Sequence, residues 1–80
     1  MGSLRTGRQL AAARVLAGLD RTGLAAAAGL TSFTVRRLEQ QDKISAHTRT
    51  VEALEKALAD KGVRLLNDRF PGCQLSEAVL

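Results

Sequence analysis

The sequence predicts a mainly α-helical fold of four or five helices followed by a short C-terminal β-hairpin. Helix-forming residues, above all alanine and leucine, dominate the chain up to about residue 61. Single glycines at positions 18, 29 and 62 follow the predicted helical stretches and can end helices. After Gly62 the composition changes to two short apolar segments around a Pro-Gly turn. We therefore divide the 80 residues into a helical domain, 1–62, and a hairpin or tail, 63–80.

Apolar periodicity and capping residues place the helices. Leu10, Ala13 and Ala17 repeat at helical spacing and form the inner stripe of the first helix. Asp20 and Thr31 are favourable N-caps for the second and third helices. The predicted helices cover residues 6–17, 21–28, 32–40 and 47 or 48 to 61, and residues 41–46 are predicted to form a loop.

The fourth helix has an amphipathic pattern. Val51, Leu54 and Leu58 form its apolar stripe. Glu52 and Lys56 are four residues apart in the favourable orientation and are expected to pair.

The residue pattern of the tail predicts strands over residues 63–66 and 73–75, with a turn over 67–72. A two-stranded hairpin alone is marginally stable in water. It must therefore either pack on the helices of its own chain or pair with a second chain, and the sequence leaves both alternatives open.

The net charge of +4 is concentrated in one half of the chain. Residues 1–47 carry seven basic and three acidic residues, whereas residues 48–80 carry five of each. A concentrated basic excess favours a polyanionic partner. On charge alone, a solvated surface rich in arginine explains the pattern equally well.

The chain has one cysteine, Cys73, and one histidine, His47. A lone thiol fits a reducing compartment, so we expect a cytoplasmic protein. An inert thiol is the preferred interpretation, a disulfide across a dimer is the alternative, and a catalytic thiol is the least favoured. No run of about 18 apolar residues occurs, so no membrane span is expected.

Enzymatic function is not expected. The sequence has no paired acidic residues in a recognisable cleft, no metal-ligand spacing and no phosphate-cradling glycine loop. We therefore expect no catalytic residues, no cofactor and no metal.

The most informative segment is residues 21–40, RTGLAAAAGLTSFTVRRLEQ. It predicts two short helices that cross at a steep angle. Ala25 is small where the helices approach most closely, and Gly29 can adopt positive φ at the turn. The positions expected to face inward are Leu24, Ala28, Leu30, Val35 and Leu38.

This pattern resembles the helix-turn-helix of the phage repressor and Cro proteins, the Xre family. The resemblance covers roughly residues 6–61 and is strongest over 14–39. In that family an arginine of the first helix commonly pairs with the glutamate that ends the recognition helix, and Arg14 and Glu39 occupy these positions. Gly23 departs from the pattern, because the family usually has a good helix former there.

The resemblance implies a lambda-repressor-like domain over residues 1–62 that binds double-stranded DNA, and a small bacterial transcriptional regulator, most simply a repressor. Its recognition helix, about residues 32–40, would lie in the major groove. Two such helices about one DNA turn apart read a palindrome, so a homodimer is expected, with the hairpin as a candidate dimerisation element. The implied DNA contacts are Arg21, Thr31, Ser32, Phe33, Thr34, Arg36, Arg37, Gln40 and Lys43.

The expected roles differ along the recognition helix. Ser32 discriminates little between bases, whereas Arg37 can bind guanine through two hydrogen bonds. Arg36 would reach either a base or a phosphate. Phe33 would either pack on thymine methyl groups or fold back onto the domain, and the sequence favours neither.

Phosphate contacts are expected on both flanks of this helix. Arg21 at the start of the second helix is one candidate, and Gln40 and Lys43 are candidates on the other flank. For Lys43 a solvated loop charge is an equal alternative, and the neighbouring Asp42 weakens the case for a strong contact.

The rival hypothesis is an antitoxin-like module that binds a partner protein and regulates its own promoter. Phe33 and Phe70 are the only aromatic residues, which gives little support for a large protein-binding face.

Overall fold

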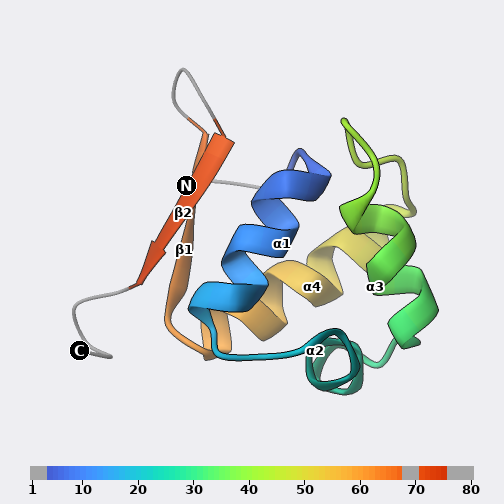
Figure 1. Cartoon of the computed structure of the whole chain (residues 1–80), viewed down its shortest axis with the longest axis horizontal. Helices are drawn as coiled ribbons and strands as arrows, with labels where there is room; N and C mark the ends of the chain where they lie inside the picture. The colour runs from blue at the N-terminus through green and yellow to red at the C-terminus, as the bar shows by residue number, and fades with distance from the viewer. Residues whose placement is uncertain (1–3, 68–70, 76–80) are drawn as a thin grey trace.

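A computed structural model describes residues 4–67 and 71–75 of the chain. This part is mainly α, and its elements lie in the predicted order (Figure 1). They are α1 (Gly7–Leu16), α2 (Arg21–Ala28), α3 (Ser32–Glu39), α4 (Thr48–Asp60), β1 (Val63–Asn67) and β2 (Pro71–Leu75).

Side-chain caps explain where the first three helices begin. The Thr6 side chain accepts a hydrogen bond from the Gln9 amide of α1. Asp20 accepts one from Gly23 at the start of α2 at 2.6 Å. Thr31 caps α3 in the same way. The predicted helices extended one residue too far at several ends, because capping residues were counted as helix.

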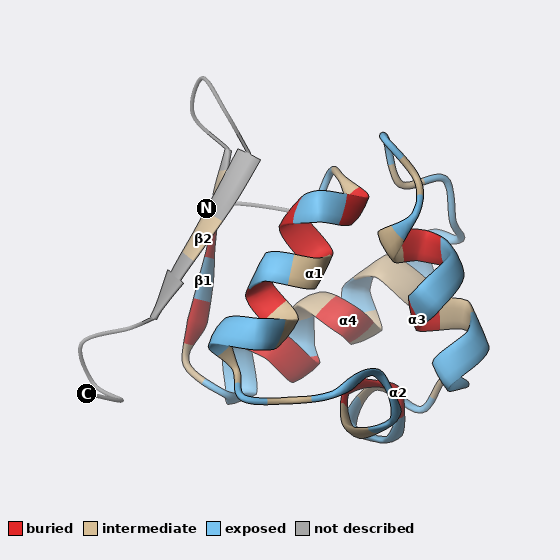
Figure 2. Cartoon of the chain, viewed as in Figure 1, coloured by how far each residue is buried: buried red, intermediate tan, exposed pale blue. Residues whose placement is uncertain are grey.

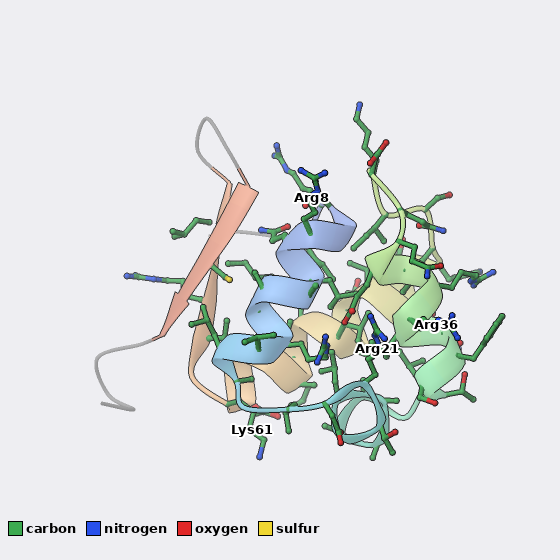
Figure 3. All side chains as sticks on the ribbon, in the orientation of Figure 1. Arg8, Arg21, Arg36 and Lys61 are labelled. Carbon is green, nitrogen blue, oxygen red and sulfur yellow. The ribbon has the colours of Figure 1, made fainter. Side chains whose placement is uncertain are left out.

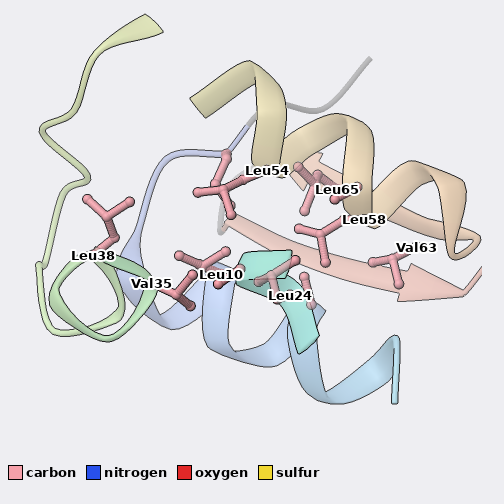
Figure 4. Packing of buried hydrophobic residues seen from close by; sticks show 12 residues of the cluster. Leu10, Leu24, Val35, Leu38, Leu54, Leu58, Val63 and Leu65 are labelled. Carbon is pink, nitrogen blue, oxygen red and sulfur yellow. The ribbon is translucent and has the colours of Figure 1, made fainter. Parts of the chain in front are cut away.

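The core lies where the four helices meet (Figure 4). Each helix contributes at least one side chain with no exposed surface, and burial of each such leucine contributes about 1.5–3 kcal/mol. These fully buried residues are Leu10, Leu24, Val35, Leu38, Leu54 and Leu58. The apolar periodicity of α1, α3 and α4 thus identified most of these core positions, whereas the predicted stripe residues Ala17 and Val51 are only partly buried.

The hairpin packs on its own chain. β1 and β2 are antiparallel, with Val63 opposite Leu75 and Leu65 opposite Cys73. Both strands contact α1, and β1 also contacts α4 (Figure 1). Val63 and Leu65 are buried in the shared core. Of the two alternatives for the hairpin, packing on the helices is therefore observed, and pairing with a second chain stays a prediction.

The predicted turn over 67–72 was too long. Asn67 lies opposite Pro71, and Leu66 lies opposite Gly72, so both strands extend into it. Pro71 is tolerated because it is the first residue of β2, where a missing N–H costs little. The middle of the predicted turn, residues 68–70, lies outside the described residues, as do residues 76–80 of the tail.

The predicted pair between Glu52 and Lys56 was wrong. Lys56 instead contacts Asp60, with 3.3 Å between Nζ and Oδ2, in the last turn of α4. Both side chains are exposed, so this pair contributes little to stability.

One polar side chain in the interior was not anticipated. Gln9 is only 2% exposed. Its Oε1 accepts from the Arg5 amide at 2.7 Å, and its Nε2 donates to the Leu66 carbonyl at 3.2 Å. Gln9 therefore joins the segment before α1 to the hairpin.

The start of α1 packs directly on the end of α3. The Gly7 amide donates to the Gln41 carbonyl at 2.9 Å. A Cβ at Gly7 would collide with the carbonyl oxygens of Leu38, Glu39 and Gln41. Only glycine allows this approach, which fixes α3 against α1.

Candidate nucleic-acid interface

α3 has one buried side and one exposed side (Figure 2). Val35 and Leu38 have no exposed surface and face the core. Of the residues expected to contact DNA on this helix, Ser32, Phe33, Arg36 and Arg37 are exposed, and Thr34 is partly buried. Two apolar anchors thus hold a helix whose other side is open to a ligand.

The turn before α3 supports this arrangement. Gly29 has the left-handed conformation, with φ of 71°. Leu30 packs against the core, and its amide donates to the Ala25 carbonyl at 2.8 Å. Ala25 itself is buried. α2 and α3 are therefore joined by a short, well-packed turn.

The structure brings Arg14 and Glu39 together. Arg14 Nε lies 2.7 Å from Glu39 Oε2, and Arg14 Nη2 lies 3.4 Å from Oε1. Arg14 Nη1 also donates to the Leu19 carbonyl at 3.1 Å. The two side chains are only 16% and 3% exposed. This ion pair connects α1, the segment before α2 and the end of α3.

Glu39 has a second partner that the sequence did not reveal. Arg21 Nε lies 3.0 Å from Glu39 Oε1. Figure 3 shows the Arg21 side chain reaching from α2 toward α3. It remains 46% exposed, and its terminal nitrogens make no hydrogen bond to the described residues. Arg21 is thus held by Glu39 at one nitrogen and accessible at the others.

Phe33 does not fold back onto the domain. It is 69% exposed and is, with Val15 and Leu16, one of three large exposed apolar residues in the described part of the chain. The alternative in which the ring packs on its own surface is therefore wrong. An exposed aromatic ring in the first turn of α3 is available to contact a partner.

Thr31 and Thr34, two of the residues expected to contact DNA, form hydrogen bonds that cap the N-terminus of α3. The Thr34 amide donates to Thr31 Oγ1 at 3.2 Å, and the two hydroxyl oxygens lie 2.9 Å apart. Thr31 and Thr34 thus stabilise the start of the helix, where Ser32 and Phe33 are exposed.

The segment after α3 is a loop. Gln40 caps α3 and is exposed, and Lys43 is exposed further along. Gln41 Oε1 accepts from the Ser45 amide at 2.8 Å and shapes the loop. Asp42 is also exposed, so the loop carries charges of both signs.

The lone thiol is partly buried. Burial raises the pKa of the Cys73 thiol above its ordinary value. A smaller fraction is therefore the nucleophilic thiolate at neutral pH, which favours the interpretation of Cys73 as inert.

The described residues contain no group of three or more His, Cys, Asp and Glu side chains that could hold a metal ion. Within the same residues, no helix has both the length and the apolar character that crossing a membrane requires.

Comparison with known proteins adds no assignment, since neither a family model nor a curated protein matches this chain.

Proposed function

We propose that this chain binds double-stranded DNA and regulates transcription, most simply as a repressor, with α2 and α3 as a helix-turn-helix. The observation that carries the proposal is the division of α3 into two sides. Val35, Leu38 and Glu39 fix the helix, and the opposite side is polar, basic and exposed. A helix presented in this way fits the major groove of B-DNA, which is about 12 Å wide.

The charge around α3 supports a polyanionic partner. Arg36 and Arg37 are exposed and make no ion pair with the described residues. The acidic residue of this helix, Glu39, is buried and neutralised by Arg14 and Arg21. The exposed side of α3 is therefore basic with no opposing carboxylate on the same helix.

The residues proposed to contact the DNA bases lie on this exposed side of α3. Arg37 would donate two hydrogen bonds to a guanine, the commonest specific contact in the major groove. Phe33 would pack on thymine methyl groups, and Ser32 would contact either base type. Arg36 would bind a neighbouring base or phosphate.

Arg21 is proposed to bind a backbone phosphate. It is the first residue of α2, where amide N–H groups also point outward. The bond to Glu39 holds Nε, and the accessible terminal nitrogens can donate to phosphate oxygens. This contact would position the domain on DNA without selecting a sequence.

Two subunits are proposed to act together. One eight-residue helix reads few base pairs, whereas two helices about one DNA turn apart read an inverted repeat. The hairpin at the edge of the domain is the proposed place of contact between the subunits.

Selection of bound duplexes from a random library at physiological salt tests the proposal. An enriched inverted repeat is expected. Failure to enrich any sequence, together with loss of binding at moderate salt, would contradict sequence-specific binding. That outcome would favour the antitoxin-like alternative, in which the exposed Val15 and Leu16 of α1 would face a partner protein.

A further inference from the structure

Three basic residues lie on two distant segments of the chain whose backbones are in contact beside the end of α3. The Ile44 amide donates to the Arg5 carbonyl at 2.9 Å, which places Arg5 next to the loop that carries Lys43. Arg8 follows Gly7, which packs against the last carbonyls of α3. Arg5, Arg8 and Lys43, here called the basic cluster, therefore surround the junction of α1 and the loop after α3.

The charges of the basic cluster are free to bind a ligand. All three residues are exposed, and their charged groups make no hydrogen bond or ion pair with the described residues. Asp42 is the acidic residue in the same loop, so the cluster with Asp42 carries a net charge of +2. Arg8 also lies in the first turn of α1, where the helix dipole disfavours a cation. Stability of α1 therefore does not explain its position.

The length of α3 relates the cluster to the proposed DNA interface. An α-helix of eight residues is about 12 Å long. If α3 lies across the groove with its first turn over the bases, its other end reaches the edge of a groove about 12 Å wide, and the Arg37 side chain contacts a base from the last turn by pointing into the groove. The sugar–phosphate backbone runs along that edge.

We propose that Arg5 and Arg8 join Lys43, which the sequence already made a candidate for a phosphate contact, to form a second phosphate-binding site that holds the DNA backbone beside the C-terminal end of α3. This inference rests on the proposed function, because it needs α3 to lie in the major groove. The ligand is the phosphodiester backbone of the same duplex, so the site adds affinity and fixes the orientation of the helix. Asp42 opposes the binding and limits the affinity.

The test measures binding of the full chain to a mixed-sequence duplex two helical turns long, over a range of salt concentrations. The variant is Arg5→Ala/Arg8→Ala. The control is Lys56→Ala/Lys61→Ala, which removes the same charge from exposed residues of α4 and its C-cap. Figure 3 shows that Lys61 and Arg8 lie at opposite ends of the domain.

The slope of log K against log salt is expected to become shallower by about 0.9 for each lost phosphate contact. Near physiological salt this corresponds to roughly fivefold weaker binding per contact. The control is expected to keep the wild-type slope. Asp42→Asn is expected to strengthen binding, which tests the cluster without removing any of its members.

Failure of this second site and failure of the proposed DNA binding give different results in this experiment. A wild-type chain that binds the duplex, with a double variant that loses no more affinity than the control, would overturn the second site alone. A double variant with a lower melting temperature but an unchanged salt slope would show that these arginines stabilise the end of α3. That result would also overturn the second phosphate-binding site. A wild-type chain that binds no duplex would overturn both proposals.

Discussion

The two sides of α3 differ in how many contacts their side chains make within the domain. On the inner side, Val35 and Leu38 are fully buried, and Glu39 pairs with two arginines. On the outer side, Arg36 and Arg37 have no partner among the described residues, and Phe33 is exposed. Stability and proposed DNA binding therefore depend on different residues of one helix, and mutations should affect them separately.

Arg14→Ala is expected to have the largest effect on the inner side. It leaves Glu39 buried, with only the half-exposed Arg21 as a partner. Removing one member of such a pair costs about 3–5 kcal/mol of the free energy of unfolding. Urea denaturation measures this loss, and an unchanged unfolding midpoint would show that the pair does not hold the fold.

Gly7→Ala tests the contact between α1 and the inner side of α3. The added methyl group would collide with three backbone carbonyls, so the helices must separate, at a cost of about 1–3 kcal/mol. Gly23→Ala in α2 is the matched control, because the atoms nearest to its added Cβ belong to the Asp20 and Leu19 side chains and not to the backbone, with Asp20 Oδ1 at 3.0 Å. The control is expected to stay within about 0.5 kcal/mol of the wild type or to be more stable. Equal stability of the two variants would argue against close packing at Gly7.

Arg37→Ala tests the outer side. Loss of a base contact is expected to weaken binding to the preferred duplex by about 1–3 kcal/mol and to relax the preference at one base pair. The free energy of unfolding should change by less than about 0.5 kcal/mol, because Arg37 is exposed. Binding to several duplexes measures the effect, and equal weakening on all of them would exclude a reading role.

Arg21→Gln is expected to have the smallest effect. Glutamine keeps a hydrogen-bond donor but removes the charge, so the salt slope should fall by about 0.9 with base preference unchanged. The exposed bond to Glu39 contributes at most about 1 kcal/mol to stability. An altered base preference would show that Arg21 contacts bases.

Local signals in the sequence predicted much of the helical architecture. α2 begins and ends at the predicted residues, because the residues that cap it, Asp20 and Gly29, are its immediate neighbours in the sequence. The buried positions of α3 followed from the spacing of Val35 and Leu38. Such features depend on neighbours a few residues away, which a single sequence contains.

Contacts between distant segments were harder to predict. Nothing near Gly7 in the sequence indicates that three carbonyls of another helix lie against it. The second pairing of Glu39 depends on the crossing of α2 and α3. Gln9 left a weak signal, because it lies four residues before Ala13 on the inner stripe of α1. The basic cluster likewise forms only when α1 packs beside the loop that contains Lys43.

The most direct test of the central claim is an NMR titration of the full chain with its selected duplex. The claim predicts the largest changes in amide chemical shift at residues 31–37 and at Arg21, with small changes in β1. Changes concentrated around Val15 and Leu16, with those of α3 unaffected, would contradict it and place the partner on α1.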